Sequence, residues 1–344
     1  MHADIIYIGL LWEGGTCLDR KRALEQLGFL VQGFDVTSYR SRSRILASIE
    51  GRLHFGPNVI RLNQDVIGFV KGLPSARIIW FDRTTWIWPE TLQAIRRITG
   101  AMLLHYTPDP QLLFHRSRHF DACIPIFDAV ITTKRYEVDL YKQRGAKEII
   151  VTWQSFDRDR FYPRPPSPEY ATDVTLIGHY ERHYARVASA ARKADARVSI
   201  WGPGWLRARA RRGALKACIK GNGLWGEEYA AALSSARIGL GVLSKWVPEK
   251  HTTRSVEIPA SGSMLLAERT EEHQELFREG YEAEFFADLE ELRDKVGYYL
   301  RNESLRARIA TQGRERCIQA GYDNVARLEQ VMQQILGNST SVGA

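Results

Sequence analysis

The sequence predicts an α/β protein made of two domains, each a doubly wound parallel sheet. The chain has 344 residues, which is too long for one ordinary hydrophobic core and suits two domains of roughly 150–170 residues each. Apolar strand-like runs alternate with amphipathic helical runs, and the alternation restarts after a proline-rich break. Strands and helices at this spacing indicate a parallel sheet covered by helices on both faces.

The first half of the chain supplies one complete set of these elements. Strands are expected at residues 4–10, 29–35, 76–82, 101–106, 128–133 and 148–153. Helices are expected at 17–28, 89–100 and 137–146, and the first two end at Gly28 and Gly100, since glycine is common where a helix stops. Residues 1–156 are therefore expected to form the first domain.

The second half repeats the pattern after a hinge. Residues 157–170, DRDRFYPRPPSPEY, hold four prolines and interrupt the alternation, as inter-domain linkers do. Strands are expected at 173–179, 196–202, 237–243 and 264–268, and helices at 181–194, 227–236 and through most of 289–336. The second domain is expected at 171–337, with a last helix that can cross back to the first domain, and 338–344 are expected to form a frayed tail.

Composition narrows the class of partner and the compartment. The net charge is +8 and the isoelectric point is about 9.3, which suits anionic partners. Much of the excess charge lies at 38–44 and 205–216, which are either solvated faces or places of peripheral contact with a membrane. The four cysteines have no paired spacing, so no disulfide framework or zinc knuckle is expected. No apolar run is long enough to span a bilayer, and we expect a cytoplasmic protein, with peripheral attachment at the inner face of the membrane left open.

Residues just after the strands are the candidates for chemistry, because parallel sheets bind ligands at the carboxyl ends of their strands. In the first domain, Glu13 precedes Gly14-Gly15, where backbone can approach a ligand closely. His105 and Asp109 lie at a strand end, where either could handle an acceptor proton. These three are the candidate catalytic residues, although each also has an ordinary structural explanation.

Three tempting motifs do not predict a cofactor. Asp157-x-Asp159 has the form of a metal-binding pair but falls in the linker. His179 and His183 are two histidines only, which is weak evidence for zinc. The Gly-Pro-Gly at 202–204 lacks the third glycine of a dinucleotide fingerprint. We therefore expect neither a metal nor a nicotinamide cofactor.

The stretch 249–268, EKHTTRSVEIPASGSMLLAE, predicts a nucleotide site. Thr252 and Thr253 are expected to cap a short helix beginning near Arg254, whose free N–H groups and guanidinium suit a diphosphate. Glu257 offers two carboxylate oxygens to the paired hydroxyls of a ribose. Lys245 lies in the loop before the helix, and Gly178 ends another strand on the same rim. The structural alternative is an exposed capped helix with incidental charges.

The same residues carry a family resemblance. The pair Glu249 and Glu257 has the E-x7-E spacing of the donor-site signature of many retaining GT-B glycosyltransferases. The string TRSVEIPASGSMLLAERTEEHQELFREGYEAEFFADLEELRDKVGYYL, residues 253–300, resembles the "glycosyl transferases group 1" family, especially its spore-maturation-protein-like branch. The resemblance continues through RIATQGRERCIQAGYDNVARL and, upstream, through the end of the first domain and the hinge.

This resemblance implies GT-B architecture, with two Rossmann-like domains facing a central cleft. Carried over, it places the ribose contact on Glu257, and phosphate or sugar contacts on Glu249 and Arg254. Lys250 and Arg182 match basic positions of the family. Trp225 lies where the base packs in relatives, or else is a partly buried core residue. Relatives often have Asp-Asp-Pro where this chain has Thr107-Pro108-Asp109-Pro110, which weakens the assignment of Asp109.

The implied function is a metal-independent hexosyltransferase-type glycosyltransferase. It would move a sugar from a nucleotide-diphosphate-sugar donor, of UDP or GDP type, to a saccharide, lipid-linked or protein acceptor in surface polysaccharide or glycoconjugate synthesis. Two alternatives stay open: a sugar-nucleotide epimerase of the same architecture, and a non-catalytic nucleotide-sugar-binding subunit. Nucleic-acid binding is not expected, because no recognised module is present. The pattern leaves the base, the sugar, the acceptor and the stereochemical outcome open.

Overall fold

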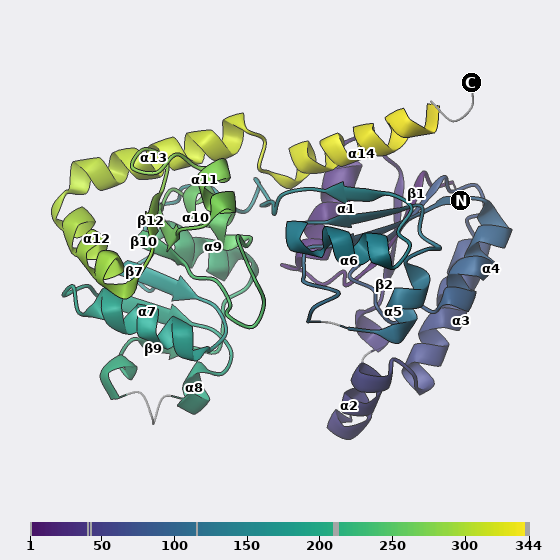
Figure 1. Cartoon of the computed structure of the whole chain (residues 1–344), viewed down its shortest axis with the longest axis horizontal. Coiled ribbons are helices and arrows are strands. Elements are labelled where there is room, and N and C mark those ends of the chain that lie inside the picture. The colour runs from purple at the N-terminus through teal and green to yellow at the C-terminus, as the bar shows by residue number, and fades with distance from the viewer. Residues whose placement is uncertain (1, 40, 42, 115, 209–212, 341–344) are drawn as a thin grey trace. The chain divides into compact units, whose positions relative to one another are not determined.

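The protein divides into two compact units. The computed structural model describes residues 2–39, 41, 43–114, 116–208 and 213–340. One unit comprises Met1–Trp153 together with Val325–Ala344, and the other comprises Gln154–Asn324 (Figure 1). The first unit is thus built from two separate pieces of the chain, because the C-terminal helix joins the N-terminal sheet.

The first unit contains a six-stranded sheet in which every strand is parallel to its neighbours, in the order β2-β1-β3-β4-β5-β6. The strands are β1 (Ile5–Gly9), β2 (Val31–Asp35), β3 (Ile78–Asp82), β4 (Met102–Thr107), β5 (Ala129–Thr132) and β6 (Ile149–Val151). The helices are α1 (Thr16–Gln26), α2 (Arg44–Leu53), α3 (Pro57–Lys71), α4 (Pro89–Thr99), α5 (Arg118–Cys123), α6 (Val138–Gln143) and α14 (Asn324–Thr340).

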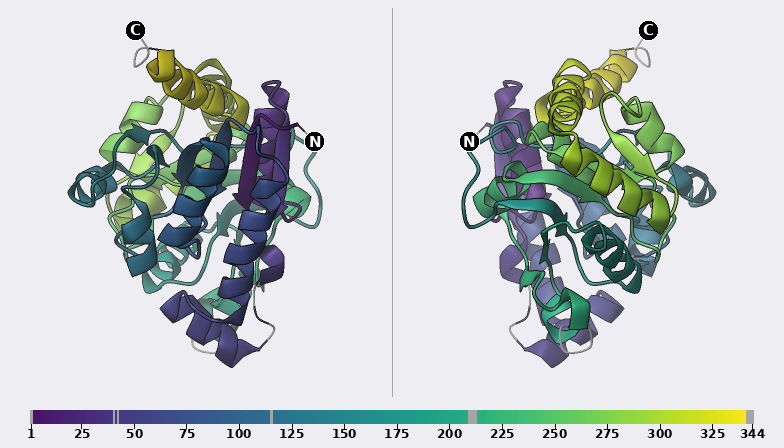
Figure 2. Two further views of the ribbon diagram at one scale, coloured as in Figure 1. Left: turned by 90° about the vertical axis from the view of Figure 1, so that its right-hand side faces the viewer. Right: turned by 90° about the vertical axis from the view of Figure 1, so that its left-hand side faces the viewer.

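Alternating side chains of β1 bury the two faces of this sheet in different cores. Ile6 and Ile8 pack with residues of α3, α4, α5 and α6. Ile5 and Tyr7 point to the opposite face, where they share a core with α1 and with Leu328, Val331, Met332 and Ile335 of α14. Figure 2 shows α3 and α4 in front of the sheet in its left view. Without α14, part of the second core would have no cover.

The second unit contains another six-stranded parallel sheet, in the order β12-β11-β10-β7-β8-β9. The strands are β7 (Thr172–Ile177), β8 (Val198–Trp201), β9 (Ile219–Gly221), β10 (Ala236–Gly241), β11 (Met264–Glu268) and β12 (Glu284–Phe286). The helices are α7 (Arg182–Arg192), α8 (Trp205–Ala208), α9 (Gly226–Ser234), α10 (Arg254–Ala260), α11 (Glu271–Leu276), α12 (Leu289–Arg301) and α13 (Glu303–Gln319).

The two faces of this sheet are also covered by different helices. Side chains of α7 and α12 share one core with Ile238 and Leu240 of β10. Gly239 points to the opposite face, where a β-carbon would lie 2.5 Å from Ile258 of α10. Only a glycine lets α10 approach the strand this closely, so this residue sets the height of α10 above the sheet.

The predicted fold class is confirmed: two Rossmann-like units, each a doubly wound parallel sheet. The strands and helices expected from the alternation are all present, with ends that differ by a few residues. The expected frayed tail is wrong for residues 338–340, since α14 continues through Thr340, and 341–344 lie outside the described residues. Parts of the basic runs 38–44 and 205–216 lie outside them as well.

No helix among the described residues is long and apolar enough to cross a membrane.

Candidate functional site

The site is built at the edge of the second sheet where β7, β10 and β11 end. The strands are parallel and adjacent, so their carboxyl ends lie together at one edge. Gly178 follows β7, Leu243 follows β10, and Glu268 is the last residue of β11. Polar side chains from these three strand ends meet here, and together we call them the edge cluster: Glu181, His183, Lys245, Arg254 and Glu268.

Glu268 is the acceptor at the centre of the edge cluster. Its Oε1 accepts hydrogen bonds from the Leu243 backbone N–H at 2.8 Å and from His183 Nε2 at 2.9 Å, and Lys245 Nζ forms an ion pair with the other oxygen. Burial alone would raise the pKa of this carboxyl, but the bonds from His183 and Lys245 outweigh burial and lower it. Glu268 therefore stays ionised and ties β10, α7 and the following loop together.

A second carboxylate orders the same loop from the side of α7. Glu181 is buried, and its oxygens accept from the Lys245 backbone N–H at 3.1 Å and contact His179 Nε2 at 2.7 Å. The His179 ring in turn packs on Trp246, with centroids 5.1 Å apart. Glu181 and Glu268 were not predicted from the sequence, although both follow or end a strand and the strand-end rule could have found them.

The expected capping of α10 by threonine side chains is wrong. Thr253 is itself helical and its side chain makes no cap bond. Instead the Thr252 backbone N–H donates to Ser255 Oγ at 3.1 Å, so the serine at the second position of the helix closes its start. Ser255 Oγ also contacts His273 Nε2 at 2.8 Å, which anchors α10 to α11. The hydroxyl of Thr252 is buried with no hydrogen-bond partner among the described residues.

Arg254 reaches from α10 to the end of the sheet. Its Nη2 donates to the carbonyl of Val242 at 3.2 Å and contacts the Tyr184 hydroxyl at 3.3 Å. Burial alone would lower the pKa of the guanidinium, but Tyr184, Tyr229, Glu257 and Glu249 raise it. Nε and Nη1 have no acceptor among the described residues, so this cation keeps donors for another anion.

Both members of the E-x7-E pair act on this guanidinium, but they differ in exposure. Glu249 is partly exposed in the loop before α10. Glu257 is only 4% exposed and accepts a hydrogen bond from the Tyr229 hydroxyl at 2.7 Å. Tyr229 of α9 covers Glu257, so this carboxylate is less accessible than that of Glu249. Its carboxylate has further lone pairs, so the tyrosine contact does not by itself use up its accepting capacity.

Gly178 and Trp225 lie where the sequence placed them, at element ends. A β-carbon on Gly178 would lie 2.8 Å from the Tyr184 ring and 3.9 Å from Arg254 Nη1, so the glycine keeps the space beside the guanidinium open. Trp225 precedes α9 and is 56% exposed, with its ring over Gly223. The alternative of a partly buried core tryptophan is therefore wrong.

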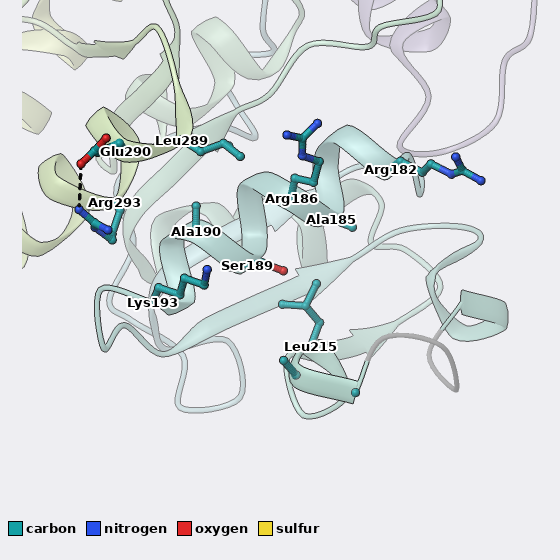
Figure 3. Close-up of a pocket in the computed structure, with 12 residues that line it drawn as sticks. Arg182, Ala185, Arg186, Ser189, Ala190, Lys193, Leu215, Leu289, Glu290 and Arg293 are labelled. Carbon is teal, nitrogen blue, oxygen red and sulfur yellow. Dashed lines mark ion pairs between the residues drawn. The ribbon is translucent and has the colours of Figure 1, made fainter.

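Two basic candidates lie outside the edge cluster. Lys250 forms an exposed ion pair with Glu271 at 3.1 Å. Arg182 lines a separate open cavity of about 850 Å³ between α7, α12 and residues 213–215. Figure 3 shows Arg182 and Lys193 at opposite ends of α7, with Arg186 between them. Lys250 is thus paired outside the edge cluster and Arg182 lines another cavity, so their assignment to the donor rests on the resemblance alone.

In the first unit, two of the three candidate catalytic residues are paired with arginine, and one of them is exposed and the other partly exposed. Glu13 contacts Arg22 at 2.6 Å and its side chain is 77% exposed. Asp109, after β4, contacts Arg83 at 2.6 Å. Arg83 follows β3 with a φ of +58°, a conformation that is costly for a non-glycine residue, so the chain holds this arginine at the strand end under strain.

The third candidate, His105, does not face solvent. It is fully buried on β4, its ring packs against Phe120 and Phe127 with centroids 4.6 and 5.2 Å away, and neither ring nitrogen has a partner among the described residues. Burial lowers its pKa to about 3. The expectation of an accessible proton carrier is wrong, because side chains alternate along a strand and residue 105 points into the core.

We expect His105→Leu to remove part of the acid sensitivity of the protein. A histidine whose pKa falls from about 6.5 unfolded to about 3 folded contributes stability above pH 6.5 that is lost progressively as the pH falls toward the folded value. Between pH 6.5 and 5 the parent should lose about 2 kcal/mol through this group, at about 1.4 kcal/mol per pH unit. Urea unfolding at both pH values measures the loss, and an equal loss in parent and variant would contradict the prediction.

Beside His105's strand, the end of β3 holds a buried ionic network that the sequence did not reveal. Asp82 is fully buried and binds Arg20 through two bonds, Nε to Oδ2 at 2.7 Å and Nη2 to Oδ1 at 2.9 Å. The Tyr7 hydroxyl also donates to Asp82, and the Arg20 guanidinium lies 4.6 Å from the centre of the Tyr106 ring. Nothing in residue spacing places Arg20 opposite Asp82, since their contact depends on the order of the strands.

The Asp-x-Asp motif at 157–159 has a structural role. The Asp157 carboxylate accepts the Asp159 backbone N–H at 2.9 Å, which forms a local turn in the linker. Across the part of the chain that the structure describes, no group of three or more His, Cys, Asp or Glu residues is placed to hold a metal ion.

Comparison with known proteins agrees with this architecture. Residues 182–333 match the family model described as "Glycosyl transferase-like". This range contains the whole edge cluster except Glu181, and it contains both members of the E-x7-E pair. A search of curated protein sequences finds no match.

Solved structures with the same fold cover nearly the whole chain. A sucrose-phosphate synthase from Thermosynechococcus elongatus aligns with a TM-score of 0.69 at 15% identity, over 97% of this chain and 99% of its own. An alpha,alpha-trehalose-phosphate synthase (UDP-forming) from Burkholderia vietnamiensis aligns with a TM-score of 0.67 at 11% identity, over all of both chains.

The Anabaena protein HepE, solved in complex with UDP and glucose, aligns with a TM-score of 0.65 at 16% identity, over 98% of this chain and all of its own. Likeness at these identities establishes the fold. The family match covers the second unit from α7 onward and continues into α14. The chain therefore has GT-B architecture, and its residues 182–333 are similar to the glycosyl transferase-like family model.

Proposed function

We propose that the protein is a glycosyltransferase whose second unit binds a nucleotide-diphosphate-sugar of UDP or GDP type. The observation that carries the proposal is Arg254, a partly buried cation with unused donors that is held between Glu249 and Glu257 at the carboxyl edge of the sheet. The glycosyl transferase-like match spans these three residues. The relative solved with UDP and glucose supports the choice of donor class.

Different residues would act on the two bonds that change during sugar transfer. The bond between the anomeric carbon and the diphosphate oxygen breaks, a bond to an acceptor oxygen forms, and the acceptor proton leaves. Arg254 and Lys245 would meet the charge that develops on the departing diphosphate, which is why we propose a metal-independent reaction. Glu257 would bind the ribose, and Trp225 would lie against the base. Asp109 and Glu13 remain the candidates for the acceptor proton, since both carboxylates are accessible.

The proposal extends to the acceptor class and the family branch. We propose a saccharide, lipid-linked or protein acceptor and a place in surface polysaccharide or glycoconjugate synthesis, with the string 253–300 supporting the spore-maturation-protein-like branch. A cytoplasmic location is part of the same proposal.

Incubation with radiolabelled UDP-glucose and GDP-mannose, without an acceptor, tests the reaction. A transferase should hydrolyse its donor slowly and release nucleoside diphosphate and free sugar. An isomerised nucleotide sugar would instead show an epimerase, and a donor that binds but stays intact would show a binding subunit. Release should continue in excess EDTA, whereas a loss that manganese restores would overturn metal independence. Arg254→Ala should abolish release, and Arg308→Ala, an exposed arginine on α13, serves as the matched control.

A further inference from the structure

Helix α2 of the first unit exposes an apolar face. Ile45 is 75% exposed, Ile49 46% and Leu53 61%, at helical spacings of four residues, which places all three on one side of the helix. Phe55, 54% exposed, extends the same surface just beyond the helix. Among the described residues no other helix or strand packs broadly on α2, which lies beyond one end of α3 in Figures 1 and 2.

The exposed face of α2 contains no acidic side chain. The only carboxylate of the helix, Glu50, points inward and is fully buried, where it accepts from the backbone N–H of Asn58 at 2.9 Å and from its Nδ2 at 3.0 Å. Gly56 leaves room for it, since a β-carbon there would lie 2.6 Å from Glu50 Cγ. With the acid turned inward, none of the residues of α2 whose side chains are described as exposed carries a negative charge; they are Ile45, Ser48, Ile49, Gly51, Arg52 and Leu53.

Cations and aromatic rings border this face. Arg52 is exposed on the helix itself. His54, at the end of α2, contacts Ser117, and the residues on either side of Ser117, Arg116 and Arg118, are both exposed. Phe55 stacks on Trp88, with centroids 5.7 Å apart. In the sequence, three more arginines directly precede or begin the helix, within SYRSRSR.

We propose that this surface, Ile45, Ile49, Leu53 and Phe55 with Arg52 and Arg116, docks the protein on an anionic lipid surface. An amphipathic helix with aliphatic and aromatic side chains on one face and arginines around it lies in the boundary between headgroups and acyl chains. The arginines are attracted by the negative surface potential of a membrane that contains anionic lipids, which strengthens binding. The charge complementarity selects the lipid, because an uncharged apolar partner would have no use for the arginines. The inference does not rest on transferase activity and would stand if the proposed reaction failed.

Sedimentation of the full chain with sucrose-loaded vesicles tests the inference. Phosphatidylcholine and phosphatidylglycerol vesicles at a ratio of roughly 7:3 should bind the parent far better than phosphatidylcholine alone, and salt should weaken the binding. Ile45→Ser/Ile49→Ser should lower the partition coefficient tenfold or more, at about 1.4 kcal/mol per tenfold. Arg52→Gln/Arg116→Gln should lower it roughly fivefold for each charge, on the anionic vesicles only.

Matched substitutions elsewhere serve as controls, since the altered side chains are exposed and the fold should survive. Ile318→Ser, 55% exposed on α13, and Arg308→Gln on the same helix should leave the partition coefficient unchanged. Equal binding by the parent and the α2 variants, or no binding by the parent, would overturn the inference. A second result would also overturn it: the parent is a dimer that binds no vesicles, and Ile45→Ser/Ile49→Ser makes it a monomer. The face would then join two copies of the chain.

Discussion

Asp82→Ala is expected to destabilise the first unit by about 3–5 kcal/mol. The carboxylate lies in the interior, where it accepts two hydrogen bonds from Arg20 and one from Tyr7. Removing it leaves the guanidinium of Arg20 buried without its counter-charge. An unpaired buried charge lowers the free energy of unfolding far more than the loss of a surface contact does. A unit whose total stability is about 5–15 kcal/mol loses a large part of it.

Urea unfolding followed by far-ultraviolet circular dichroism measures this loss. Asp139→Ala, which breaks an exposed pair with Lys142, is the control and should change the free energy of unfolding by less than about 0.5 kcal/mol. Arg20→Met/Asp82→Leu should recover part of the loss, because apolar replacement of both charges leaves none of them unpaired. A loss no larger than that of Asp139→Ala would show that Arg20 finds other partners or water.

Arg254→Ala and Glu257→Gln are expected to weaken nucleotide binding by roughly 10- to 150-fold. Hydrogen bonds to charged groups contribute about 1.5–3 kcal/mol, which converts to that range of affinity. The two losses should differ in kind. Arg254→Ala should affect UDP more than uridine, because the guanidinium meets the diphosphate, whereas Glu257→Gln should affect both alike, because both carry the ribose.

Isothermal titration calorimetry of each variant with UDP, GDP and uridine separates these outcomes. Tyr229→Phe is the matched control for Glu257, since it removes the hydrogen bond at 2.7 Å but keeps the carboxylate, and it should change affinity little. Arg254→Ala should remain folded, because the Tyr184 hydroxyl still donates to the Val242 carbonyl at 3.0 Å. Folded variants with parental affinity for UDP would remove α10 from the donor site.

Strand periodicity predicted most of the fold, because a buried parallel strand leaves an unbroken apolar run. IIYIG, IIWFD and MLLAE are all such runs, and each forms a central or near-central strand. The short strands β9 and β12 were not predicted, since their residues, IKG and EFF, do not form an unbroken apolar run, whereas IIV of the equally short β6 does. Helix α3 could have been predicted from its N-terminal proline and from Val59, Leu62, Val66 and Val70, which are all buried.

The candidate site was predicted in its location and only partly in its contacts. The spacing of Glu249 and Glu257 led to α10, and Arg254 lies between them as expected. The burial of Glu257 under Tyr229 depends on where α9 packs, which no local pattern encodes. His105 misled for a similar reason: a polar residue near a strand end indicates a site only if it points outward, and here it points between Phe120 and Phe127.

The position of α14 has a consequence for biosynthesis. The sheet of the first unit is translated before the second unit, yet the face of that sheet that carries Ile5 and Trp80 is closed by Leu328, Val331 and Met332, which are translated only after the second unit. Throughout translation of the second unit, this nascent sheet therefore keeps part of an apolar face uncovered, which makes it a substrate for chaperones. A message cut short before the codon of residue 325 would yield a polypeptide whose N-terminal half never becomes complete, so quality control can recognise truncated copies by that open face.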